Sequence, residues 1–310
     1  MTASSRDWDV SSLQGDKRRQ RRERVVRNVM VGAAAVSVLI SALIVYSLVF
    51  EAVKFIADVD LSTLWDIGWF PRRNVFDLRT IVAATLIVTL IAMLVATPLG
   101  LAAAVYLSEY ANPKARKVLK PILEILAGIP SVVLGYFALR FIAPNIIDNL
   151  FSSAKPANLA AAGLGVGLLT IPLIASIAED SLASVPRALR EASSGLGARR
   201  KTTTLRIVLP AAVSGLTAAF IVATSRAIGE TMVVYIAGGA ADSAIRTYNP
   251  LEPGLTMTAA MASVASGTDN VAGVGPTFQS LFFVGFLLFF ITLLMNLVAG
   301  RFVRRYRQEY

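Results

Sequence analysis

The chain has 310 residues, of which 55% are apolar, and a formal net charge of +10. An apolar content this high excludes a disordered chain and an ordinary soluble enzyme. The sequence has no Cys and no His, which excludes disulfides, thiol catalysis, proton relays through His and metal sites built from Cys and His. We expect no metal site and no cofactor.

Apolar segments of about 20 residues, long enough to cross a bilayer, recur along the chain. Six are expected, at residues 29–50, 81–107, 118–143, 159–178, 211–237 and 279–300. The charged leader before the first segment is longer than that of a signal peptide, so we expect this segment to be retained. The pattern predicts an all-α integral membrane protein with six transmembrane helices. Proline and glycine predict breaks at residues 128–131 in the third segment and near Gly229 in the fifth.

Lys and Arg are distributed unevenly between the two sides that these segments define. Of the 30 basic residues, 22 lie in the N-terminal tail, the second and fourth loops and the C-terminal tail, and six lie on the opposite side. The positive-inside rule then places both termini in the cytoplasm. A nucleic-acid patch is the alternative for the basic cluster at residues 17–27, but an apolar segment follows it at once, so no nucleic acid is expected.

Two features are expected on the outer side. Trp65 and Trp69 are either anchors at the membrane interface or part of a small buried cluster. The loop at residues 238–278 is too long to be structureless, and a short helix is expected within it at residues 255–266.

Arg226 and Glu230 lie inside the fifth apolar segment. A charge at membrane depth costs about 2.5–3.5 kcal/mol on insertion scales, so it persists where it pairs, meets water or meets a ligand. Four residues apart on one helix, these two side chains would share a face. This predicts a pathway for a charged solute, and the alternative is an ion pair that only holds helices together.

The loop at residues 180–210 contains a short segment with an apolar side at Leu182, Val185, Leu189 and Leu196. Ser184 is expected to cap a short helix there, with Pro186 in its first turn, and Gly195 and Gly197 are expected to end it. By its composition this helix lies on the membrane surface or docks a partner.

A resemblance is carried by Glu191-Ala192-Ser193, then three residues, Gly197, then nine residues, and Ile207-Val208-Leu209-Pro210. This is similar to the EAA signature of bacterial ABC-importer permeases, with Ser193 where Ala is usual. The segments at 126–135, 185–191 and 225–232 resemble the permeases of phosphate importers, PstC and PstA, and the Arg-Ala-Ile-Gly-Glu-Thr-Met form is more similar to PstC.

The resemblance implies a type I ABC-importer permease in the bacterial plasma (inner) membrane. It implies that Arg226 and Glu230 line a phosphate pathway, and that Leu189, Glu191, Ala192 and Gly197 couple the chain to an ATPase. The implied partners are a second homologous permease, a cytoplasmic ATPase dimer, an extracytoplasmic phosphate-binding protein and membrane lipid. No catalytic residues are expected, and no Walker A loop exists in the sequence, so another chain must hydrolyse ATP.

The expected organisation begins with a basic tail at 1–28, a first transmembrane helix at 29–50 and an outer loop at 51–80. A permease core at 81–300 contains the coupling loop at 180–210, and a cytoplasmic tail at 301–310 ends the chain. Three alternatives stay open: a permease for another oxyanion such as sulfate or molybdate, a membrane scaffold or sensor that transports nothing, and an ion-driven secondary transporter.

Overall fold

The computed structural model describes residues 17–239, 245–266 and 275–306, and the chain divides into two units, residues 1–50 and 51–310. The described part of the first unit belongs to helix α1 (Lys17–Asp58), whose end belongs to the second unit. In the first unit the described side chains of α1 are mostly exposed. Most of the expected basic tail at 1–28 lies outside the described residues. The fold of the second unit positions the candidate site.

In the second unit a small hairpin follows the end of α1. Its elements are the 3-10 helices η2 (Leu61–Trp65) and η3 (Pro71–Arg73) and the antiparallel strands β1 (Trp69–Phe70) and β2 (Val75–Phe76). Trp69 is 3% exposed and packs its ring edge-on to Phe76. Trp65 is 60% exposed, with the guanidinium of Arg79 4.7 Å from its ring centroid. The two tryptophans therefore divide the two expected roles: Trp69 is buried, and Trp65 is open to the surroundings.

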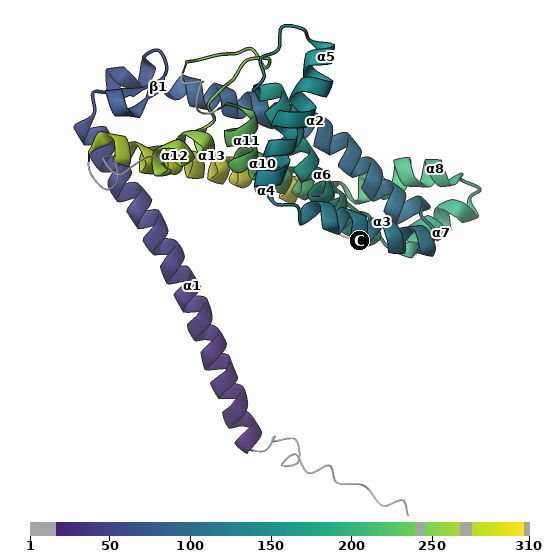
Figure 1. Ribbon diagram of the computed structural model, residues 1–310. Coiled ribbons are helices and arrows are strands. Elements are labelled where there is room, and N and C mark those ends of the chain that lie inside the picture. Colours follow the sequence, from purple (N-terminus) through teal and green to yellow (C-terminus); the bar gives the residue numbers. More distant parts are fainter. Residues whose placement is uncertain (1–16, 240–244, 267–274, 307–310) are drawn as a thin grey trace, which may run out of the picture. The chain divides into compact units, whose positions relative to one another are not determined.

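Helix α2 (Leu78–Val105) and helix α6 (Leu159–Ala183) form the centre of the second unit. Asp77 caps α2 by accepting from the backbone N–H of Arg79 at 3.0 Å. Small residues let the two helices approach closely, as in other membrane helix pairs: a Cβ added at Gly163 would lie 2.7 Å from Ile91. Helix α2 ends in a π-helical turn, η4 (Tyr106–Tyr110). Figure 1 shows α2 running from the hairpin end of this unit toward the end that carries α7 and α8.

The third apolar segment differs from the expectation. Residues 118–127 belong to a separate helix, α3 (Pro113–Ala127), and the chain breaks at residues 128–130 as expected. The candidate span is Ser131–Leu150, built from α4 (Ser131–Phe137), the π-helix η5 (Ala138–Ile147) and α5 (Asp148–Leu150). The reason is Pro130, which lacks an N–H donor and disfavours helical backbone at the residue before it.

The fifth apolar segment is also built from pieces. After α7 (Arg187–Gly195) come α8 (Arg200–Thr203), the π-helix η6 (Thr204–Val208), α9 (Leu209–Ala211), α10 (Val213–Ile228) and α11 (Met232–Ala237). The chain bends by 70° between the helix that ends at Ala211 and α10. The expected break at Gly229 is confirmed, since Gly229 caps the end of α10.

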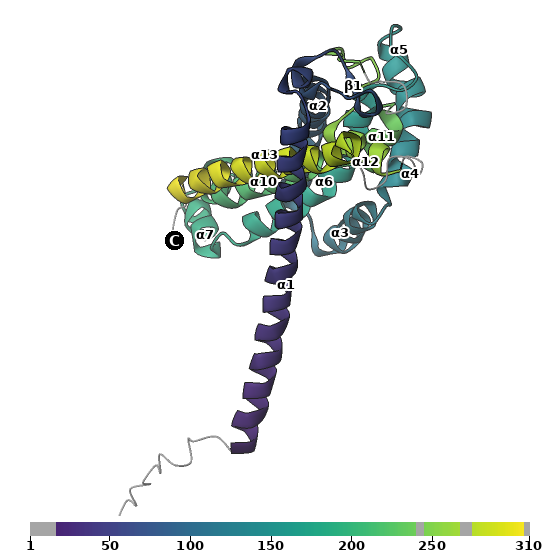
Figure 2. The ribbon, with the colours of Figure 1, turned by 90° about the vertical axis from the view of Figure 1, so that its left-hand side faces the viewer.

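The remaining helices are α12 (Met257–Ala265) and α13 (Pro276–Tyr306). Helix α12 confirms the short helix expected in the outer loop, and α13 packs beside α10. In both views of the second unit, α5 and the hairpin lie away from the end where α3 and α7 lie (Figures 1 and 2). Within the described residues, five helices are long and apolar enough to cross a membrane, and the bent pair at Arg200–Ala211 and Val213–Ile228 makes a sixth if it counts as one span.

Candidate functional site

A cavity of about 350 Å³ lies where α3, α6 and α10 meet, and we call it the Arg226 cavity. Its wall is apolar along Leu169, Pro172 and Leu173 of α6. The side chains that carry charge or a hydroxyl in the wall are Lys120, Glu124, Ser176, Glu179 and Arg226. A concave, mostly apolar site with a few converging polar groups is the usual form of a small-ligand site.

Two of these charges are held in place by an ion-pair network between α3 and α6. The carboxylate of Glu179, which is 1% exposed, accepts a hydrogen bond from the guanidinium of Arg116. The Nζ atom of Lys120 lies 3.4 Å from its other oxygen. Two cations thus neutralise one buried carboxylate and tie α3 to α6. A buried carboxylate without such partners would be strongly unfavourable.

Arg226 is the cation of the wall that this network leaves free. Its side chain is exposed on α10 within the last turn, and its guanidinium has no ion-pair or hydrogen-bond partner among the residues that the structure describes. Glu124 shares the cavity and likewise forms no ion pair with a described residue. A free guanidinium offers planar donors that suit an oxyanion and keeps its charge at any physiological pH.

Glu230 lies in a different environment, so the shared helix face expected for Arg226 and Glu230 is wrong. Helix α10 ends at Ile228, and Glu230 follows the break, where it is 9% exposed. Its backbone carbonyl accepts a hydrogen bond of 2.7 Å from Thr258 of α12. In the described part of the chain no ion pair joins the two residues. The periodicity argument failed because it assumed a helix that continues through Gly229.

The residues expected to couple to an ATPase lie on and just after α7. Glu191 and Ala192 are exposed, while Leu189 is half-buried against the apolar cluster around Leu182 and Val185. Gly197 has a φ of +77°, a value that favours glycine, and an added Cβ would meet no atom within 4 Å. The structure therefore presents Glu191, Ala192 and Gly197 on an open surface.

Three details of this loop differ from or refine the expectation. Pro186, not Ser184, is the N-terminal cap of α7, and Ser184 instead ends α6. Leu196 does not join the apolar side, because it is 89% exposed. Ser193 is buried, and its hydroxyl bonds to the hydroxyl of Thr203 at 2.8 Å, which joins α7 to α8.

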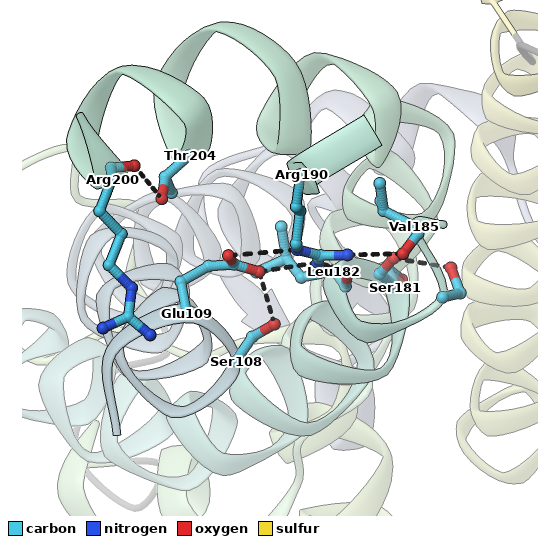
Figure 3. A network of polar contacts seen from close by, with 9 residues as sticks. Ser108, Glu109, Ser181, Leu182, Val185, Arg190, Arg200 and Thr204 are labelled. Atoms are coloured by element: carbon cyan, nitrogen blue, oxygen red, sulfur yellow. Dashed lines mark hydrogen bonds and ion pairs between the residues drawn. The ribbon is translucent and has the colours of Figure 1, made fainter. Parts of the chain in front are cut away.

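Sequence reasoning missed the residue that fixes the position of α7. Arg190 donates to the carboxylate of Glu109 at 2.8 Å and to the carbonyl oxygens of Leu182 at 2.8 Å and Val185 at 2.5 Å. Figure 3 shows Arg190 reaching from α7 between these groups. Glu109 is only 7% exposed, so this pair binds α7 to the π-helical turn at the end of α2. The signal available in the sequence was Glu109, an acidic residue at the end of the second apolar segment.

Comparison with known proteins identifies the family. Residues 96–308 match the model of the "Binding-protein-dependent transport system inner membrane component" family. The chain is 30% identical to the "Probable ABC transporter permease protein YqgH" of Bacillus subtilis, over 83% of this chain and 85% of that protein. It is 31% identical to the "Phosphate transport system permease protein PstC" of Mesorhizobium japonicum, over 79% of this chain and 78% of the relative.

Solved structures agree on the fold. The MetNI methionine ABC transporter in an inward-facing conformation aligns with a TM-score of 0.53 at 20% identity, covering 73% of this chain and 92% of the matched chain. A bacterial alginate ABC transporter, in complex with its pentasaccharide-bound periplasmic protein, aligns with a TM-score of 0.61 at 15% identity, covering 92% of this chain and 98% of the matched chain. The chain is thus a transport component with the fold of type I ABC-importer permeases, and it belongs to the family of inner-membrane permeases of binding-protein-dependent transport systems.

Proposed function

We propose that this permease forms part of the path by which inorganic phosphate crosses the membrane. The observation that carries the proposal is the free guanidinium of Arg226 in a cavity between α3, α6 and α10. Phosphate is an anion with several acceptor oxygens at neutral pH, and a guanidinium presents matching donors. The PstC names of several relatives support phosphate over other oxyanions.

Glu230 has a separate part in this proposal. It follows the break between α10 and α11 and is nearly buried. Because it forms no ion pair with Arg226 in this structure, Arg226 is available to an anion. A change of backbone at Gly229 would bring the carboxylate toward Arg226, and the carboxylate would then displace the bound anion. Glu230 therefore acts in release of phosphate, with the break at Gly229 as its hinge.

The proposed assembly contains this chain, a second homologous permease, a dimer of ATPase subunits and a phosphate-binding protein. The proposed contact with the ATPase is the exposed surface of Glu191, Ala192 and Gly197. Leu189 holds α7 in place by packing against the apolar cluster beneath it. The charge distribution supports a cytoplasmic location for this surface and for both termini, in a bacterial inner membrane. The proposed permease core is residues 81–300, preceded by the helix at 29–50 and the outer loop at 51–80.

Reconstitution tests the proposal. The chain is assembled with its partner subunits in proteoliposomes, and ATP-dependent uptake of radiolabelled orthophosphate is measured with and without a hundredfold excess of sulfate or molybdate. We expect uptake that requires ATP and binding protein and that neither competitor reduces. Uptake of sulfate or molybdate in place of phosphate would reassign the solute, and no uptake of any of the three would refute an oxyanion pathway.

A further inference from the structure

A second cavity, of about 510 Å³, lies between the end of α2, the start of α3, α7 and α8, and we call it the arginine cavity. Four arginines line it: Arg116, Arg187, Arg190 and Arg200. The one acidic residue in its wall is Glu109. The wall therefore carries a net charge of +3 from its side chains. It is distinct from the Arg226 cavity, and nothing in the proposed transport path uses it.

The four arginines are not equally engaged. Arg190 is committed to Glu109 and to two backbone carbonyls, and Arg116 is paired with Glu179. Among the residues that the structure describes, neither Arg187 nor Arg200 has a carboxylate partner. The guanidinium of Arg200 lies 5.3 Å from the ring centroid of Tyr110, and in Figure 3 its side chain extends beside Glu109 without joining the network.

We propose that the arginine cavity is a second anion site, which takes a phosphate group on the side where α7 meets the ATPase. Unpaired guanidinium groups in a concave wall are the chemistry that recognises phosphate oxygens, through paired charge-assisted hydrogen bonds. The hydroxyl of Ser194 also lines the cavity, but it donates to the backbone carbonyl of Arg190 at 2.9 Å, so Arg187 and Arg200 carry the recognition. The phosphate group belongs either to free orthophosphate or to the headgroup of an anionic membrane lipid, and both present negatively charged phosphate oxygens.

Arg116 connects this site to the Arg226 cavity. It lines the arginine cavity while its guanidinium holds Glu179, which lines the Arg226 cavity. An anion in the arginine cavity competes with Glu179 for Arg116. The carboxylate then loses one of its two cations, and its negative charge repels an anion in the Arg226 cavity. Occupancy thus slows transport, a consequence that rests on the proposed function.

Binding of radiolabelled orthophosphate to the assembled transporter, in nanodiscs without nucleotide or binding protein, tests the site. The test variant is Arg187→Gln with Arg200→Gln. Its matched control, Arg199→Gln with Arg206→Gln, removes the same charge from exposed positions outside the cavity. Both are made in an Arg226→Gln background, so that the Arg226 cavity does not contribute. We expect binding to weaken about tenfold or more for the test variant, from loss of charge-assisted hydrogen bonds, and to be unchanged in the control.

The lipid composition of the nanodiscs distinguishes the two sources. In nanodiscs of phosphatidylcholine alone, a site for free phosphate binds orthophosphate, and binding is weaker in the test variant than in the control. If the site binds a lipid, native mass spectra of protein from nanodiscs that contain phosphatidylglycerol show this lipid bound to the control but not to the test variant. Either result supports the site. Equal orthophosphate binding and equal lipid retention by the test and control variants would overturn it, whether or not phosphate transport itself is found.

Uptake by preloaded vesicles tests the connection through Arg116. Unlabelled phosphate on the ATPase side should slow the initial uptake of the transporter with native Arg226, and the Arg187→Gln, Arg200→Gln variant should lose this slowing. Equal slowing in both would overturn the connection. If the unaltered transporter takes up no phosphate even into vesicles that contain no phosphate, the result would instead count against the proposed function.

Discussion

Some charged residues of this permease form buried ion pairs that join helices, and others have no ion-pair partner in the described part of the chain. Glu109 and Glu179 are almost fully buried, and each is held by arginine or lysine from another element. Leaving such a buried carboxylate without any cation costs about 3–5 kcal/mol. Arg226 and Arg187 have no such partner in the described part of the chain. Both proposed anion sites depend on these unpaired charges.

A pair of glycines at the end of α7 allows a matched test at the same scale. An added Cβ meets open space at both Gly195 and Gly197, but only Gly197 has a positive φ. Gly197→Ala should therefore lower stability by about 1–2 kcal/mol through backbone strain alone. Gly195→Ala, in a helical position, should be neutral or stabilising. The unfolding temperature in detergent measures both, and equal values for the two variants would contradict the strained turn.

The proposed coupling role of Gly197 is tested on the same two variants in the assembled transporter. Gly197→Ala should uncouple ATP hydrolysis from uptake, because the turn that follows α7 changes its path, whereas Gly195→Ala should stay coupled. The ratio of phosphate transported to ATP hydrolysed is the measurement. Full coupling in Gly197→Ala would remove Gly197 from the contact with the ATPase.

At the scale of helices, the sequence predicted two breaks and six spans, a number that the described residues reach when the bent pair counts as one span. It did not predict where each helix lies. Hydropathy located α2, α6 and α13 because each is one continuous apolar helix. It merged α3 with the third span because both are rich in apolar residues, although Pro130 separates them. The position of Glu230 was missed because helical periodicity carries no information across a break, and α10 ends at Ile228.

Contacts between helices far apart in the chain were beyond sequence reasoning. Arg190 meets Glu109 across 81 positions, and Arg116 meets Glu179 across 63. Neither pair has a local spacing that would reveal it. The EAA-like motif, in contrast, is local, and the short helix predicted around it is α7.

The close packing of α2 on α6 gives a prediction at this scale. Gly163 lies where a Cβ would come within 2.7 Å of Ile91. Gly163→Leu should overpack this interface, which costs about 1–3 kcal/mol, and should reduce the amount of folded protein in the membrane. Gly300→Leu is the control, because an added Cβ at Gly300 meets nothing within 4 Å. Equal unfolding temperatures for the two variants would contradict the α2–α6 contact.

At the scale of the whole molecule, the charge distribution predicts the orientation in the membrane. Leu196 is 89% exposed beside α7, and Ser153 is exposed in the loop between α5 and α6. Since the sequence has no Cys, a single cysteine at either position gives a clean signal. Ser153→Cys should react with an impermeant thiol reagent from outside intact cells, and Leu196→Cys only after the membrane is opened. The opposite pattern would reverse the topology and move the arginine cavity to the outer side.

Phosphate uptake by Arg226 variants tests the central claim most directly. Arg226→Gln removes the free cation of the Arg226 cavity, and Arg140→Gln removes a cation from a candidate span outside that cavity. At equal abundance of assembled transporter, initial phosphate uptake in proteoliposomes should fall at least about tenfold in Arg226→Gln, from loss of charge-assisted hydrogen bonds to the anion. It should remain near the unaltered rate in Arg140→Gln. Uptake by Arg226→Gln as fast as by Arg140→Gln would contradict the assignment of Arg226 to the phosphate path.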